Sequence, residues 1–514
     1  DCLNRFNGMF AFAIWDTVER QLFLARDRYG IKPLYWGRTG DIFCFASEVK
    51  AILAHPKFSA RLDKEALLEY FTFQNLLGER TLFAGVSLLP AGHWMSVSAG
   101  QTINLAGPTQ YWDFDFTEPI SPEDPREYLD ELDRLFRQAV SRQLVSDVEI
   151  GSFLSGGIDS GAITALAASQ FPSLKTFTCG FDLTSASGLE IAFDERRRAE
   201  MLSHQYQTEH YEVVLKSGDM ERAIPRLTYH LETPRVGQSY PNYYVAKLTS
   251  KFVKVVLAGT GGDELFGGYP WRYYRAVTSS NFSTYIDKYY NYWQRLVNNQ
   301  NLQKMFRPIH LDIRDVWTRD LFSNVFPATL NGTQSPEEHV NRSLYFEAKT
   351  FLHGLLVVDD KLSMAHSLET RVPFLDNDLV EFAMRLPVGL KLARLDEVRR
   401  IDENEPGKLH KYFQNTRDGK LLLRQMLSRY VPDEIASGVK QGFTACAPDA
   451  NWFKGASLNY VQQAILDKNA RIYEYLDRET VTALVQQHLD GKQNRRLLLW
   501  SLLTFEQFCH TFLP

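Results

Sequence analysis

The stretch Ser155-Gly156-Gly157-Ile158-Asp159-Ser160 follows an apolar, strand-like run, Val148–Leu154, and opens a helical pattern, Ser160–Ser169. Two adjacent glycines carry no Cβ atoms, so successive backbone N–H groups and the helix N-terminus can hold an anion. Ser155 and Ser160 add hydroxyl donors, and Asp159 suits a place beside phosphates if it holds a metal ion. Two glycines alone would fit a tight turn, whereas the complete set between a strand and a helix predicts phosphate binding.

A second glycine-rich segment reads Ala258-Gly259-Thr260-Gly261-Gly262-Asp263-Glu264-Leu265-Phe266-Gly267-Gly268-Tyr269. It follows the apolar run Phe252–Leu257, and open α/β sheets bind ligands at the C-terminal ends of their strands. We therefore expect Asp159 and Asp263 to converge on one cleft. Two carboxylates facing a triphosphate would repel it unless Mg²⁺ lies between them. Asp263 and Glu264 could instead cap the following helix, although a cap does not need the flanking glycines.

Outward from these two loops, the pattern predicts an α/β protein of two parts. Residues 126–514 alternate helix and strand around the loops, which favours a Rossmann-like parallel sheet, and they become mostly helical after about 275. Residues 1–115 contain short β-rich runs such as Phe10–Trp15 and Ile42–Ala46, which predict an antiparallel sheet. The stretch Phe114–Pro125, rich in Pro, Asp and Glu, fits a linker.

The composition argues against several classes of function. The chain has 514 residues, a formal net charge of −5 and 44% hydrophobic residues, so it can bury large cores but offers no basic field for nucleic acid. Its five cysteines lie far apart without metal-ligand spacing, which favours a reduced, cytoplasmic setting. No apolar run reaches the length of about 18 residues that spans a membrane. We expect small-molecule substrates and no nucleic-acid or membrane partner, and we leave a homodimer open.

Four motifs, in order, resemble the synthetase domain of glutamine-hydrolysing asparagine synthetases. They are residues 154–160, residues 257–269, residues 363–376 and Lys440-Gln441-Gly442-Phe443. The first also resembles the pyrophosphate loop of ATP pyrophosphatases, which cleave ATP between its α and β phosphates. The resemblance implies an adenine nucleotide α-hydrolase (HUP) fold behind a partial Ntn-type module. It also implies ATP and Mg²⁺ as cofactors and aspartate, with glutamine or ammonia, as substrates.

Carried over to this chain, the resemblance implies roles for single residues. Asp159 and Asp263 match the magnesium carboxylates. Lys440 matches the lysine that stabilises the adenylation transition state, although without the match it would look like a solvated surface lysine. Asp360-Lys361 resembles a pair placed near the nucleotide. The residues expected to hold ATP or its pyrophosphate are Leu154, Ser155, Gly156, Gly157, Asp159, Ser160, Cys179, Ala258 and Gly259, with Cys179 a packing residue near the adenine and not a nucleophile.

Two features depart from the family. Thr260 stands where well-known members have Glu or Asp, and a threonine cannot serve as a general base near neutral pH. Either Glu264 substitutes, so that Thr260, Glu264 and Lys440 form the catalytic set, or the chain belongs to a subgroup with a modified substrate. The N-terminal part resembles only the latter half of a class II glutamine amidotransferase domain. Cys2 does not match that family's N-terminal nucleophile, so we expect a missing N-terminal segment and no glutamine hydrolysis by the chain as given.

Together these features predict an amide ligase that converts the aspartate side chain to aspartyl-AMP, which ammonia then attacks to give asparagine, AMP and pyrophosphate. Thr260 keeps open a specialised amide- or ring-forming enzyme of the same fold, such as a β-lactam synthetase or a lasso-peptide cyclase. A tRNA-modifying enzyme with the same loop would need a basic groove, and a non-catalytic scaffold would not need Asp159, Asp263 and Lys440 together.

Overall fold

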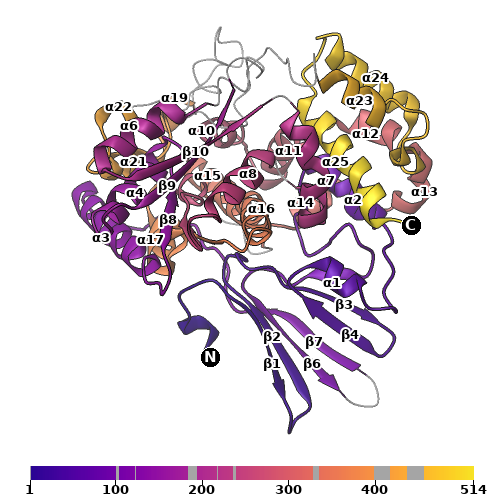
Figure 1. Cartoon of the computed structure of the whole chain (residues 1–514), viewed down its shortest axis with the longest axis horizontal. Coiled ribbons are helices and arrows are strands. Elements are labelled where there is room, and N and C mark those ends of the chain that lie inside the picture. Colours follow the sequence, from indigo (N-terminus) through magenta and orange to yellow (C-terminus); the bar gives the residue numbers. More distant parts are fainter. Residues whose placement is uncertain are drawn as a thin grey trace.

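The computed structural model describes residues 2–99, 103–121, 123–182, 194–216, 218–235, 239–327, 335–398, 417–436 and 457–514. Within these ranges the chain forms three β-sheets and a large body of helices. In Figure 1 the N-terminal strands β1 to β7 project from one side of the body that the rest of the chain forms. None of the described helices is long and apolar enough to cross a membrane.

The N-terminal module consists of two antiparallel sheets with the strand orders β1-β2-β6-β7 and β4-β3-β5. Gly40, at φ 56°, makes the tight turn between β3 and β4 that a residue with a Cβ atom would strain. The antiparallel β-rich module predicted from the sequence is confirmed. Its elements are η1 (Leu3–Arg5), β1 (Ala11–Asp16), β2 (Gln21–Arg26), β3 (Tyr35–Thr39), β4 (Ile42–Ala46), α1 (Val49–Leu53), α2 (Lys64–Phe73), β5 (Val86–Leu88), β6 (His93–Ala99) and β7 (Ile103–Gln110).

The central sheet has the strand order β10-β9-β8-β11-β12, and all of its neighbouring pairs are parallel. The chain adds β9 and β10 on one side of β8, and later β11 and β12 on the other side. The strand order therefore reverses between β8 and β11, and open α/β sheets bind ligands at such a switch point. The parallel-sheet fold predicted from the sequence is confirmed. The strands are β8 (Ile150–Phe153), β9 (Lys175–Phe181), β10 (Glu209–Leu215), β11 (Val255–Leu257) and β12 (Glu369–Arg371).

Helices flank the sheet and dominate the rest of the chain. Among the described residues after 275, β12 is the only strand, which confirms the helical C-terminal region. The helices around the sheet are α3 (Pro125–Gln143), α4 (Ile158–Ala168), α6 (Arg196–Tyr206), α7 (Asp219–Leu231) and α8 (Tyr240–Thr249). Those that follow are α9 (Gly262–Leu265), α10 (Pro270–Tyr273), α11 (Phe282–Trp293), α12 (Asn299–Met305), η2 (Arg307–Ile309), α13 (His310–Ile313), α14 (Thr318–Ser323), α15 (Pro336–Phe346), the π-helix η3 (Glu347–Leu352), α16 (His353–Met364), η4 (Pro373–Leu375), α17 (Asn377–Arg385), α18 (Val388–Lys391), α19 (Leu395–Val398), α21 (Leu421–Leu427), α22 (Asp433–Ala436), α23 (Leu458–Ala464), η6 (Arg471–Glu474), α24 (Arg478–Leu489) and α25 (Arg496–Phe512).

Helix α2 joins the N-terminal module to the C-terminal helices through a shared apolar core. The Tyr70 hydroxyl donates to Ser501 Oγ on α25 at 2.9 Å. The ring of Phe71, which is fully buried, lies 5.8 Å from the ring of Phe505 in an edge-on arrangement. Aromatic pairs of this kind stabilise the folded state beyond the free energy of burying their apolar surface, so α2 and α25 stabilise each other.

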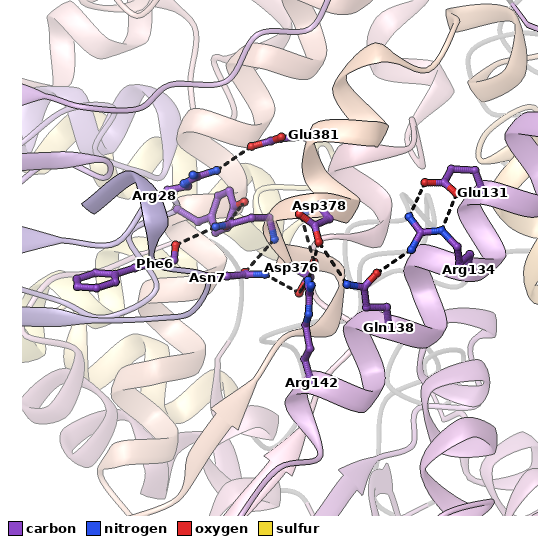
Figure 2. Close-up of polar contacts among 12 residues, drawn as sticks. Phe6, Asn7, Arg28, Glu131, Arg134, Gln138, Arg142, Asp376, Asp378 and Glu381 are labelled. Carbon is purple, nitrogen blue, oxygen red and sulfur yellow. Dashed lines mark hydrogen bonds and ion pairs between the residues drawn. The ribbon is translucent and has the colours of Figure 1, made fainter. Parts of the chain in front are cut away.

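A polar junction joins the N-terminal module to α3 and α17, and Figure 2 shows Asn7 and Arg142 pointing at Asp376. Asp376 is 2% exposed and accepts hydrogen bonds from Asn7 Nδ2 and Arg142 Nη1, each at 3.0 Å. Its neighbour Asn377 donates its backbone N–H to Asn7 Oδ1 at 3.1 Å and its side-chain amide to the Phe6 carbonyl at 2.9 Å. The last residue of the third motif thus holds the two parts of the chain together.

Candidate active site

The first glycine loop turns directly from β8 into α4 at the switch point of the sheet. Gly156 has φ 72°, and a Cβ atom there would lie 2.6 Å from Arg198 Cβ, so glycine is required both by the backbone and by the neighbouring helix α6. Gly157 is the N-cap residue of α4, and no side chain caps that helix. The first N–H groups of α4 are therefore available to an anion.

Two serines stabilise this loop by bonding to each other. Ser155 Oγ and Ser160 Oγ lie 3.0 Å apart, and the Ser155 N–H donates to Ser160 Oγ at 3.2 Å. Ser160 is 6% exposed, whereas Ser155 is exposed at the loop surface. Ser160 therefore shapes the loop from inside, and Ser155 is the hydroxyl that a ligand can reach. Leu154, just before the loop, is fully buried.

The second glycine loop, after β11, packs directly against the first. A Cβ atom on Gly259 would lie 3.2 Å from Asp159 Cβ and 3.3 Å from the Ser160 backbone nitrogen. One on Gly262 would lie 3.2 Å from Asp159 Oδ1. Ala258, buried at the end of β11, donates its N–H to the Arg371 carbonyl on β12 at 2.8 Å. The glycines thus allow the two strand-end loops to approach each other closely.

One ammonium group joins the carboxylates of the two loops. Lys420 Nζ lies 2.5 Å from Asp159 Oδ2 and 2.7 Å from Asp263 Oδ1. The Lys420 side chain is 4% exposed, and those of the two aspartates are 18% and 19% exposed. The structure therefore brings Asp159 and Asp263 together, so that a single atom contacts both.

The charge on Lys420 is held by its two partners. Burial disfavours the ammonium form, but attraction to Asp159 and Asp263 outweighs it and raises the pKa of Lys420 above its usual value. The lysine is therefore charged at neutral pH. Sequence reasoning missed Lys420, because the Asp418-Gly419 turn before α21 indicates the start of a helix but does not indicate which residues the lysine contacts. A Cβ atom on Gly419 would lie 2.3 Å from the Gly267 carbonyl, so this turn, too, packs on the second loop.

The chemistry of Asp159 and Asp263 fits a divalent cation only together with further ligands. Asp159 Oδ1 is buried and accepts no hydrogen bond from any residue that the structure describes. In the same described ranges, no group of three or more His, Cys, Asp or Glu side chains could hold a metal ion by itself. Mg²⁺ in nucleotide sites is commonly held by one or two carboxylates together with phosphate oxygens and water. Asp159 and Asp263 are two carboxylates whose spacing around one atom, Lys420 Nζ, fits this pattern.

Three of the other predicted site residues, Cys179, Glu264 and Thr260, lie within the described residues. Cys179, on β9, packs partly buried against apolar side chains, and burial raises the pKa of its thiol to about 12, as expected of a packing residue. Glu264, on α9, is 3% exposed and accepts a hydrogen bond from the Tyr269 hydroxyl at 2.7 Å. Thr260 donates its hydroxyl to Asp359 Oδ2 at 3.0 Å. Lys440 lies outside the described residues.

Asp359, on α16, is a second functional candidate that sequence reasoning missed. Asn242 Nδ2, on α8, donates to its other oxygen at 3.0 Å. Burial raises the pKa of Asp359 to about 6, and repulsion from Glu264 and Asp360 adds to the rise. The two hydrogen bonds favour the carboxylate and lower the pKa, but their effect is smaller than that of burial. Two consecutive acidic residues on a helix offered no signal, because such pairs are ordinary on a solvated face.

The pair that follows on α16 faces the N-terminal module instead of the loops. Lys32 Nζ donates to Asp360 Oδ1 at 2.7 Å, and Lys361 Nζ, which is buried, pairs with the buried carboxylate of Glu232. Lys361 Nζ also lies 4.6 Å from the ring centre of Tyr35 on β3. In this structure, Asp360 thus contacts Lys32 of the N-terminal module, and Lys361 contacts Glu232 and Tyr35.

Comparison with known proteins gives two family matches that together cover most of the chain. Residues 131–510 match the family model described as asparagine synthase, and residues 1–112 match the glutamine amidotransferase domain. A putative glutamine-hydrolysing asparagine synthetase of Mycobacterium tuberculosis is 30% identical over 98% of this chain and 76% of its own length. Asparagine synthetase 1 of Bacillus subtilis is 28% identical over 98% of this chain and 78% of its own length. A protein of Penicillium rubens named amidase chyE is 24% identical over 94% of this chain and 76% of its own length.

Proposed function

Because this chain belongs to the asparagine synthase family of ATP-dependent ligases, we propose that it activates a substrate carboxylate as an acyl-adenylate and converts it to an amide. The proposed carboxylate is the side chain of aspartate, and the proposed nitrogen source is ammonia released from glutamine. The observation that carries this proposal is the meeting of Asp159, Asp263 and Lys420 at the switch point of the sheet.

In the first step, the two loops would position the triphosphate. The N–H groups at the start of α4 and the Ser155 hydroxyl would bind the phosphates, whose negative charge they would stabilise as pyrophosphate leaves. Asp159 and Asp263 would hold the magnesium ion, which supplies charge neutralisation at the phosphate oxygens when bound. Lys420, already fixed by the two carboxylates, adds a second positive charge at the same place.

The adenosine part would lie along the adjoining strand ends. We propose that Leu154, Cys179, Ala258 and Gly259 contact AMP, because they stand at the ends of β8, β9 and β11, next to the phosphate loop. The substrate carboxylate attacks the α-phosphorus, its oxygen forms the new bond, and pyrophosphate leaves with the electron pair of the broken bond.

The second step would take place beside the second loop. We propose that ammonia attacks the acyl carbon near Thr260 and Glu264, with AMP as the leaving group, and that Lys440 assists the adenylation step. Residues 1–115 would be the amidotransferase part and residues 126–514 the synthetase part. The junction at Asp376 supports a fixed relation between these two parts.

The proposal is tested by ATP–pyrophosphate exchange with Mg²⁺ and a series of carboxylates. We expect exchange that depends on aspartate, and its loss in both Asp159→Asn and Asp263→Asn. Glu149→Gln serves as a control and should keep full exchange, because Glu149 is exposed and forms a surface ion pair with Lys175. Exchange in the wild type that does not respond to aspartate would contradict the choice of substrate.

A second candidate substrate class is favoured by one observation. Position 260 of the second loop holds a threonine where the resemblance implies Glu or Asp, and a relative of this chain carries the name of an amidase instead of a synthetase. A specialised amide- or ring-forming enzyme would show exchange with another carboxylate and none with aspartate. The same series of carboxylates therefore distinguishes the two candidates.

A further inference from the structure

The second glycine loop is bonded to a carboxylate from a distant helix. Thr260 Oγ1 donates to Asp359 Oδ2 at 3.0 Å, across 99 residues of sequence. Thr260 follows Gly259, which packs against Asp159, and precedes Asp263 by three residues. The hydrogen bond therefore places Asp359 beside the second loop, next to the point where the two loops pack together.

The amide-forming step leaves a proton that some group must accept. When an amine nitrogen attacks an acyl-adenylate, the new C–N bond forms from its lone pair, and AMP leaves with the electrons of the C–O bond. The nitrogen then carries one proton too many, and general-base catalysis of such a transfer contributes about 10²–10⁴-fold to the rate. A carboxylate near the second loop meets this need.

The other acidic residues near the loop are already engaged. Asp159 and Asp263 hold the Lys420 ammonium, and Glu264 is buried with the Tyr269 hydroxyl bonded to it. Asp360 pairs with Lys32 of the N-terminal module. Asp359 differs, because both partners that contact its carboxylate are neutral donors, Thr260 and Asn242.

We propose that Asp359 accepts the proton from the attacking nitrogen, directly or through the Thr260 hydroxyl, and that the threonine–aspartate pair supplies the base for amide formation. Through the hydroxyl, Thr260 passes its own proton to Asp359 and takes one from the nitrogen, so its state is unchanged. The products are the amide, AMP and protonated Asp359, which returns the proton to solvent. The inference rests on the proposed function and assigns the base of its second step.

The titration of Asp359 agrees with this assignment. Its pKa of about 6 leaves it ionised at neutral pH, yet makes it a stronger base than an ordinary aspartate. Burial is the largest cause of the raised pKa, and the charges of Glu264 on α9 and Asp360 on α16 raise it further.

The experiment separates the two steps in the full chain. ATP–pyrophosphate exchange with aspartate measures adenylation alone, and asparagine formation with ammonium chloride measures both steps without glutamine. The variants are Asp359→Asn, the surface control Glu149→Gln, and the double variant Thr260→Glu with Asp359→Asn. In the double variant the carboxylate is carried by residue 260 instead of residue 359, so the two partners of the hydrogen bond exchange roles.

We expect Asp359→Asn to keep exchange and to lose amide formation by about 100-fold or more. Glu149→Gln should keep both activities, because its side chain lies at the surface, and the double variant should recover amide formation. Equal loss or full retention of both activities in Asp359→Asn, with no recovery in the double variant, would overturn the inference while leaving the proposed function in place. A wild-type enzyme that shows no exchange with aspartate would overturn the proposed function, and the inference with it.

Discussion

The variant Lys420→Met tests the core of the proposed site most directly. Methionine keeps the length of the side chain but removes the ammonium that lies 2.5 Å from Asp159 and 2.7 Å from Asp263. Removing one partner of a buried ion pair costs about 3–5 kcal/mol, because the remaining charge stays buried without compensation. Since the two aspartates are 18% and 19% exposed, water relieves part of this cost, and we expect about 3 kcal/mol.

The assay is thermal unfolding at increasing Mg²⁺ concentration, with Lys175→Met as the matched control. Lys175 makes an exposed pair with Glu149, 24% and 69% exposed, and such pairs contribute less than about 1 kcal/mol. Without Mg²⁺, Lys420→Met should unfold well below both the wild type and the control. Mg²⁺ should restore much of the difference, because a divalent cation can take the place between two carboxylates that have lost their ammonium.

Exchange activity gives an independent measure of the same residue. A fixed positive group beside the negative charge that develops in the transition state lowers the activation free energy by about 3–4 kcal/mol. Lys420→Met should therefore lower the rate of exchange by roughly 10²–10³-fold, even at saturating Mg²⁺. Equal unfolding temperatures for Lys420→Met and Lys175→Met, with no difference in their response to Mg²⁺, would refute the reasoning. So would full exchange activity in Lys420→Met.

Three further variants test other parts of the structure. Gly268→Ala places a Cβ atom 2.1 Å from Asp263 Oδ1 and should abolish exchange, whereas Gly389→Ala, with open space around it, should not. Asp376→Asn weakens the junction by about 1–2 kcal/mol and should speed amide hydrogen exchange in β1 and α17. Asp359→Asn should be more stable than the wild type at pH 8 by up to about 3 kcal/mol, with the advantage gone near pH 4. The sign follows from the raised pKa of Asp359, because the folded wild type loses stability as the pH rises through about 6 and this carboxyl ionises. Urea titrations of both proteins at pH 8 and pH 4 measure the difference in the free energy of unfolding.

The parts of the site that could be predicted from sequence are those encoded within one strand, loop and helix. Both glycine loops come directly after apolar strands, so their positions at strand ends follow from local pattern. Alternating strands and helices then imply a parallel sheet, and such sheets gather ligands at one edge. The meeting of Asp159 and Asp263 is a consequence of these two steps and needs no knowledge of long-range packing.

Lys420 and Asp359 could not be predicted in this way, because their partners lie 261 and 99 residues away along the chain. Each stands on or beside a helix whose local pattern resembles that of many surface helices. Burial determines the properties of both side chains. In solvent, the lysine would not be held by two carboxylates, and the aspartate would have a lower pKa and be a weaker base. Only tertiary packing supplies that burial.

Helix α16 shows why a motif can be recognised while one of its neighbours is missed. Successive residues of an α-helix point about 100° apart, so consecutive side chains contact different parts of the protein. Asp359 bonds Thr260 in the second loop, Asp360 bonds Lys32 in the N-terminal module, and Lys361 is buried against Glu232. A displacement of the amidotransferase module that pulls on Lys32 therefore acts on the helix that holds Asp359. The same turn of α16 that anchors one half of the enzyme positions the base proposed for the other.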